Sequence, residues 1–266
     1  MPRAHINGVH INYKVEGDGE PLVLIMGFGC PGSAWFYQTR AFKKYFRVVT
    51  FDNRGVGKTD KPKEHYNIET MADDTIGLMD LLGIEKAHVL GFSLGGMVAQ
   101  GIAIKYPARV RRLILASTVS TMHHNAPELL EGLGLEENFT EKDLRDLDIG
   151  KGVTRLGASS FRNRLLRTIA LIVLPIYARL AGLDGFRGQI EAAADFDALD
   201  RLGTIQAPTL VMVGTKDITV GLRSSEVMAS RIPNARLVKI EGGAHAYVAE
   251  MSGRFNKEVL DFLRQS

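Results

Sequence analysis

Apolar runs recur along the chain and alternate with segments whose apolar positions repeat at helical spacing. This alternation predicts strands joined by crossover helices, the connection that parallel neighbours require. Strands that are apolar along their whole length are covered on both faces, so we expect an α/β fold with a mostly parallel sheet between two helical layers. The expected strands are 22–26, 48–51, 88–92, 113–117, 209–214 and 236–240, and the expected helices are 33–45, 69–82, 94–106, 222–231 and 250–264.

The chain opens differently, with polarity alternating over residues 3–15 around Asn7-Gly8. This dipeptide suits the two positive-φ positions of a type I′ turn, so the segment is predicted to form an antiparallel β-hairpin. Counting the hairpin as two strands, we expect an eight-stranded sheet.

The alternation breaks between residues 119 and 195, where no strand is predicted and charged residues are dense. We interpret this segment as a helical cap inserted into a core formed by residues 1–118 and 196–266. Its apolar run, 169–178, is about half the length of a membrane span and is interrupted by Pro175. A buried or lid helix is the favoured interpretation and an interfacial helix the alternative, so no integral membrane segment is expected.

Composition excludes several classes of protein. The formal charge of +3 is small and the basic residues form no long stripe, so nucleic acid is not an expected partner. Cys30 is the single cysteine, which rules out an intramolecular disulfide and a cysteine-based metal site and fits the cytoplasm. The first residues contain no apolar stretch typical of a secretory signal. The sequence makes no prediction of oligomeric state.

The most informative motif is Gly91-Phe92-Ser93-Leu94-Gly95, a GxSxG pattern between an expected strand and an expected helix. On such a sharp strand-to-helix turn a serine hydroxyl is pushed out above the sheet and can act as a nucleophile. A serine that only caps the helix is the simpler alternative. If Ser93 is the nucleophile, the Leu94 N–H at the helix start is one donor of an oxyanion hole.

A second oxyanion donor is predicted in the turn Gly27-Phe28-Gly29, which follows the strand at 22–26. Glycines on both sides of Phe28 let the backbone approach a ligand, so the Phe28 N–H can face a developing oxyanion. A plain glycine-rich turn is the alternative.

A serine nucleophile needs a base, and the base needs an orienting acid. Of the seven histidines, only His245 lies in a loop after the last expected strand, at the edge where Ser93 must emerge. Asp217 follows the strand at 209–214 at the same edge. A solvated histidine and an ordinary turn aspartate are the alternatives, but the order Ser93, Asp217, His245 is that of an α/β-hydrolase triad.

With these residues, the chain resembles the lidded α/β-hydrolase superfamily over nearly its whole length. The segments 52–59 (DNRGVGKT), 106–110 (YPARV) and 207–211 (APTLV) are typical of it. Within it, the elbow and the compact length look most like the enol-lactonase, small-esterase and perhydrolase branch. Met26 replaces the usual histidine of the oxyanion turn, and Val220 stands where proline is frequent. The serine argues against the related dehalogenases and epoxide hydrolases, which use an aspartate nucleophile.

A nucleotide site is a competing interpretation of 55–59 (GVGKT), because the segment ends like a P-loop. The first P-loop glycine would fall on Asp52, however, and Pro62 prevents the helix that must follow. We therefore exclude ATP binding from the sequence.

The resemblance implies a carboxylesterase-like or lactonase-like activity on a small-molecule substrate, through an acyl-enzyme on Ser93. Neither a metal nor an organic cofactor is expected. Trp35 and Val220 are the expected substrate contacts, with Phe28 and Leu94 as neighbouring walls. Carbon–carbon bond hydrolysis and peracid formation on the same triad stay open, as does a ligand-binding receptor that keeps the fold without turnover.

Overall fold

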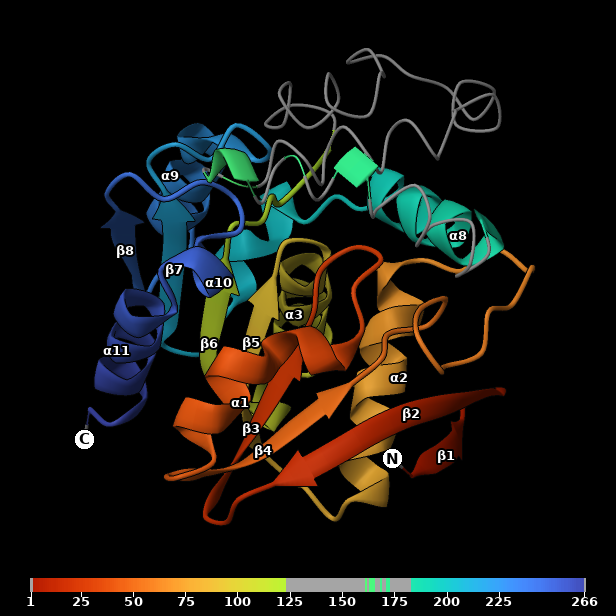
Figure 1. The fold of residues 1–266 in the computed structure, drawn as a ribbon. Helices are drawn as coiled ribbons and strands as arrows, with labels where there is room; N and C mark the ends of the chain where they lie inside the picture. Colours follow the sequence, from red (N-terminus) through yellow and green to blue (C-terminus); the bar gives the residue numbers. More distant parts are fainter. Residues whose placement is uncertain are drawn as a thin grey trace.

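The computed structural model describes residues 2–122, 161, 163–165, 168, 171–172 and 183–265. An eight-stranded sheet forms the centre of this part of the chain (Figure 1). Its strands are β1 (Arg3–Ile6), β2 (Val9–Glu16), β3 (Glu20–Ile25), β4 (Phe46–Phe51), β5 (Ala87–Phe92), β6 (Val110–Ala116), β7 (Thr209–Gly214) and β8 (Ala235–Ile240).

The strand order is β1-β2-β4-β3-β5-β6-β7-β8. From β4 to β8 every pairing is parallel, whereas β1 pairs antiparallel with β2, and β2 with β4. At the hairpin turn Asn7 has φ 47° and Gly8 has φ 79°, as a type I′ turn requires. The predicted eight-stranded, mostly parallel sheet is therefore confirmed.

Helices cover both faces of the sheet (Figure 1). Two of the predicted helices differ from the structure. The segment 33–45 is a 3₁₀ turn followed by a short helix that ends at Phe42, and 250–264 is split at Met251. The helical elements are η1 (Gly32–Trp35), α1 (Phe36–Phe42), α2 (Ile68–Leu81), α3 (Leu94–Lys105), η2 (Pro107–Arg109), α8 (Leu183–Ala194), η3 (Leu199–Thr204), α9 (Gly221–Arg231), α10 (Tyr247–Glu250) and α11 (Ser252–Leu263).

Alternate residues of the central strands enter two separate hydrophobic cores, one on each face. On β3, Val23 and Ile25 pack with residues of α2 and α3, whereas Leu22 and Leu24 pack with residues of α1 and α11. Successive side chains of a strand point to opposite faces, so burial on both sides requires an unbroken apolar run. This double burial explains the pattern from which the sheet was predicted.

The two ends of the predicted insertion lie side by side. Thr121 forms an antiparallel bridge with Asp197, and the Ala198 N–H donates to the Ser120 carbonyl at 2.8 Å. Most of 119–195, including nearly all of the apolar run 169–178, lies outside the described residues, so the division into core and cap stays a prediction. Within the described residues no helix is both long and apolar enough to cross a bilayer.

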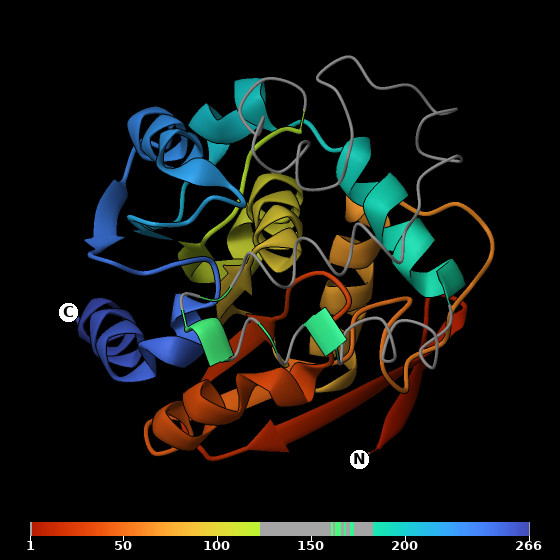
Figure 2. The ribbon, with the colours of Figure 1, turned by 45° about the horizontal axis from the view of Figure 1, so that its top comes forward.

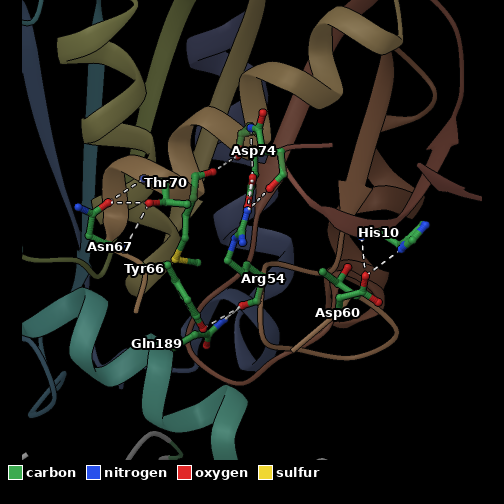
Figure 3. A network of polar contacts seen from close by, with 12 residues as sticks. His10, Arg54, Asp60, Tyr66, Asn67, Thr70, Asp74 and Gln189 are labelled. Atoms are coloured by element: carbon green, nitrogen blue, oxygen red, sulfur yellow. Dashed lines mark hydrogen bonds and ion pairs between the residues drawn. The ribbon is translucent and has the colours of Figure 1, made fainter. Parts of the chain in front are cut away.

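A buried ion pair joins the loop after β4 to α2 (Figure 3). The Arg54 guanidinium donates to both carboxylate oxygens of Asp74 at 2.8 Å and to the Asn7 carbonyl at 3.2 Å. Burial raises the pKa of Asp74 above its ordinary value, although the hydrogen bonds from Arg54 and Asn7 act in the opposite direction. The pair thus ties three segments of the chain together at the cost of desolvating two charges.

Removing one member of this pair should destabilise the protein strongly. We expect Arg54→Met to lower the free energy of unfolding by about 3–5 kcal/mol, because Asp74 stays buried without its cation. Urea denaturation measures the change. In the double variant Arg54→Met/Asp74→Leu most of the loss should be recovered, and Lys257→Met, in the exposed pair with Asp261, should have little effect. A single variant as stable as the parent would contradict this account.

Candidate active site

Ser93 occupies the turn between β5 and α3 in a strained backbone conformation. Its φ is 53° and its ψ is −124°, in a region that non-glycine residues rarely adopt. The strand ends at Phe92 and the helix begins at Leu94, so a single residue reverses the chain direction. This is the sharp turn that the GxSxG motif predicts.

The glycines of the motif are needed because backbone segments approach closely around Ser93. A Cβ on Gly91 would collide with the Gly95 carbonyl oxygen, and a Cβ on Gly95 would collide with the carbonyl oxygen of Ile25. A Cβ on Gly27 would stand 3.1 Å from the Cβ of Ser93. The start of α3 is therefore pressed against the end of β3, and the turn that follows β3 lies beside Ser93.

His245 lies in the turn after β8 and contacts the Ser93 hydroxyl. The distance from His245 Nε2 to Ser93 Oγ is 3.1 Å. The imidazole packs against the Phe92 ring at 4.9 Å between centroids, and only 6% of His245 is exposed. A buried imidazole in hydrogen-bond contact with a hydroxyl is the arrangement of a nucleophile and its general base.

Asp217 lies on the other side of the imidazole, just after β7. Its Oδ2 is 2.9 Å from His245 Nδ1, and its Oδ1 accepts the backbone N–H groups of Thr219 at 2.9 Å and Val220 at 3.2 Å. The carboxylate side chain has no exposed surface. The two backbone donors hold the carboxylate so that one oxygen faces the imidazole.

The environment of Asp217 favours its ionised form. Burial by itself raises the pKa of a carboxyl group, but the attraction of His245 and the hydrogen bonds from His245 and the Thr219 N–H outweigh it. The pKa of Asp217 is therefore lowered from its ordinary value. An ionised carboxylate at this distance can stabilise a cationic imidazole.

The two predicted oxyanion donors belong to segments that adjoin Ser93. Leu94 is the first residue of α3, and the turn containing Phe28 adjoins Ser93 through Gly27. A buried Asn53 side chain donates to the Met26 carbonyl at 2.8 Å and holds the start of this turn. The assignment of Phe28 and Leu94 as oxyanion donors stays a prediction.

The predicted substrate contacts lie apart from each other. Trp35 is fully buried in the core cluster that packs on α11, with its ring 6.3 Å from that of Phe92. Leu94 belongs to the cluster on the other face, against which Phe28 packs. Val220 is buried at the start of α9 and turns its N–H toward Asp217. The structure therefore does not bring Trp35 together with Phe28 and Leu94, and substrate contact by Trp35 or Val220 stays a prediction.

Three residues of this region escaped the sequence analysis. Ser117, with φ 43°, and Tyr247 are buried beside Asp217, and Gln189 of α8 is buried against the turn after β3. No spacing or motif marks any of them. Ser117 comes directly after β6 at the carboxyl edge, and this position was the one available signal.

Among the described residues, no group of three His, Cys, Asp or Glu side chains could hold a metal ion. The groups that the described residues do bring together are a hydroxyl, an imidazole and a carboxylate, joined by the contacts at 3.1 Å and 2.9 Å.

A family model of the alpha/beta hydrolase fold matches residues 20–250. The chain belongs to this family. Among curated relatives, the "Putative carbamate hydrolase RutD" of Azorhizobium caulinodans is 27% identical over 98% of both chains. The protein is thus a hydrolase of the α/β-hydrolase fold, as the sequence resemblance implied.

Two solved structures extend the comparison. The enol-lactonase of Burkholderia xenovorans LB400 is 26% identical, with a TM-score of 0.86 over 99% of this chain and 100% of that one. The meta-cleavage product hydrolase of Pseudomonas fluorescens IP01 is 27% identical, with a TM-score of 0.82 over 99% and 97%. This α/β-hydrolase therefore shares its fold with enzymes of different substrates.

The close approach at Gly95 predicts a sharp contrast between two substitutions in the same helix. Gly95→Ala should lower the free energy of unfolding by about 3 kcal/mol or prevent folding, because the new methyl group meets main-chain atoms. Gly101→Ala is the matched control, since its Cβ would lie 3.6 Å from Ala72 and Ile68. We expect it to stabilise α3 by up to about 1 kcal/mol in urea denaturation. Equal effects would refute the packing argument.

The lowered pKa of Asp217 predicts how stability depends on pH. A carboxyl group whose pKa is lower in the folded state contributes stability that is present above its unfolded pKa, about 3.9. That contribution is lost as the pH falls through the folded value. The difference in unfolding free energy between the parent and Asp217→Asn should therefore shrink below about pH 4. Urea denaturation at several pH values tests this, and a difference unchanged down to pH 3 would count against it.

Proposed function

We propose that this hydrolase cleaves carboxylic esters or lactones by forming an acyl-enzyme on Ser93. The observation that carries the proposal is the continuous chain of contacts from Ser93 Oγ through His245 to the buried Asp217, 3.1 Å and 2.9 Å long. Each member comes from a different strand end, at the carboxyl edge where α/β sheets place their ligands.

In the first step Ser93 Oγ attacks the substrate carbonyl carbon while its proton passes to His245 Nε2. The carbonyl π electrons move to the oxygen, and the N–H groups of Phe28 and Leu94 stabilise that oxyanion. When the oxyanion collapses, the bond to the leaving oxygen breaks and His245 returns the proton to it. An ester releases an alcohol, whereas a lactone keeps both parts in one acyl chain.

In the second step water replaces the alcohol. His245 takes a proton from the water while the water oxygen attacks the acyl carbon. His245 then gives this proton to Ser93 Oγ as the bond between Ser93 Oγ and the acyl carbon breaks. The ionised Asp217 holds the imidazole and stabilises its cationic form in both steps. All proton transfers use residues of this chain, so the proposal requires neither a metal nor an organic cofactor.

Two other substrate classes are raised by the relatives. The curated relatives named as carbamate hydrolases suggest attack on a carbamate carbonyl, and the structural relative named as a meta-cleavage product hydrolase suggests carbon–carbon bond cleavage. The same three side chains can begin either reaction at a carbonyl carbon. We favour esters and lactones because the mechanism then needs only the site described above, and because the enol-lactonase matches nearly the whole chain with a TM-score of 0.86.

Serine labelling tests the nucleophile. A fluorophosphonate probe should label the protein, and Ser93→Ala should abolish labelling and reduce turnover of 4-nitrophenyl acetate by roughly a millionfold. Ser230→Ala, at an exposed serine of α9, is the matched control and should label normally. Labelling that survives Ser93→Ala would contradict the proposal. An unlabelled parent protein would favour a non-catalytic ligand-binding role.

A substrate panel tests the bond that is cleaved. We expect kcat/KM for esters and lactones to exceed that for carbamates and diketones. Higher kcat/KM for a carbamate or a diketone, still dependent on Ser93, would keep the nucleophile and replace the substrate class.

A further inference from the structure

A buried glutamine of α8 links two turns at the carboxyl edge of the sheet. Gln189 accepts the Gly29 N–H at 2.9 Å through Oε1 and donates from Nε2 to the Arg54 carbonyl, also at 2.9 Å. Figure 3 shows its side chain reaching from α8 toward the turn at Arg54. The residue has no exposed surface, so water cannot replace either bond without a rearrangement.

The surrounding face of α8 also packs closely on these turns. The Phe186 ring meets the Phe28 ring edge-on at 5.4 Å, and a Cβ on Gly29 would collide with Phe186. A Cβ on Gly185 would likewise collide with the Gly55 carbonyl oxygen. In both ribbon views α8 lies beside the amino end of α2 (Figures 1 and 2). The close packing of Phe186 on Gly29 and of Gly185 on Gly55 therefore determines the position of Gln189.

Gln189 completes a set of hydrogen bonds that determines how the oxyanion turn is oriented. Asn53 holds the Met26 carbonyl, the Cys30 N–H donates to the Gly27 carbonyl at 3.2 Å, and Gln189 holds the Gly29 N–H. In a trans peptide the N–H points opposite to the preceding C=O. Holding the Gly27 carbonyl therefore sets the direction of the Phe28 N–H, the proposed oxyanion donor.

We propose that Gln189 is a positioning residue, through which α8 holds the oxyanion turn in its productive geometry. The inference rests on the proposed function, in which the Phe28 N–H stabilises the oxyanion. An amide suits this place because it offers an acceptor to Gly29 and a donor to Arg54 at once. Gln189 contacts neither Ser93 nor the substrate carbonyl and acts only through the turn.

The first variant removes both hydrogen bonds while keeping the size of the side chain. For Gln189→Leu we expect kcat for 4-nitrophenyl acetate to fall by about 10- to 100-fold with KM changed by less than about threefold. The hydrogen bond that is weakened, from the Phe28 N–H to the oxyanion, exists only in the transition state. The Ki of 2,2,2-trifluoroacetophenone, whose adduct with serine carries an oxyanion, should rise by a similar factor. The Ki of acetate should stay unchanged.

The second variant separates the positioning role from a purely structural one. Gln189→Glu keeps the acceptor for Gly29 but, when ionised, cannot donate to the Arg54 carbonyl. A buried carboxyl group costs stability, so we expect its Tm to be no higher than that of Gln189→Leu. Its kcat should nevertheless lie between those of Gln189→Leu and the parent. If the role were only structural, kcat would follow Tm instead.

A matched control exists at another buried glutamine. Gln38 donates to the Val248 carbonyl of α10 at 2.7 Å and not to a residue of the oxyanion turn. Gln38→Leu should lower Tm but leave kcat within about threefold of the parent. Three results would overturn the proposal. Gln189→Leu could keep the kcat of the parent, its lower kcat/KM could come from a higher KM, or Gln38→Leu could lose as much kcat as Gln189→Leu. If only the role of Gln189 is wrong, the parent protein still turns over ester through Ser93. If the proposed function is wrong, it does not, so the two failures are distinguishable.

Discussion

The contact between the first turn of α3 and the end of β3 is the constraint on which the site depends. Gly95 approaches the main-chain oxygen atoms of Ile25 and Met26 so closely that no other residue fits there. This approach gives Ser93 its strained conformation and brings the turn at 27–29 alongside it. The strain of Ser93, which costs on the order of 1–3 kcal/mol, persists because packing on both sides leaves the residue no relaxed alternative.

Around this contact, buried polar side chains support loops that have no regular hydrogen bonding of their own. Asp52 accepts the Gly32 N–H at 2.8 Å and the Lys58 N–H at 2.9 Å, while Asn53 binds the Met26 carbonyl. Arg54 binds Asp74 through its side chain and Gln189 through its carbonyl. Backbone groups that are buried away from a sheet or helix need such partners. The segment after β4 therefore supports the turn at 27–29.

The sequence allowed prediction of the sheet, and of the meeting of Ser93, Asp217 and His245 at its edge, for identifiable reasons. Doubly buried strands leave unbroken apolar runs, and Ser93 and Asp217 each follow such a strand at the carboxyl edge, whereas His245 follows the partly exposed β8. The helix predicted over 33–45 begins as the 3₁₀ turn η1 and ends early, at Phe42. Helix propensity does not distinguish a 3₁₀ turn from an α-helix. Gln189 could not be predicted, because its two partners are backbone groups 160 and 135 residues away in the chain. Likewise, an apolar residue such as Trp35 gives no sign of which face of the sheet it will join.

The pairing of residues 120–121 with 197–198 has a consequence for how this protein can diversify. Because residues 120–121 pair with 197–198, the chain between them can be lengthened, shortened or exchanged while the sheet keeps its register. Closing a longer loop costs only slightly more entropy. Residues of α8 cannot be exchanged in this way, because α8 packs on the turns at 27–29 and 54–55. A segment exchanged with a relative is therefore best placed between residues 122 and 183, with α8 retained.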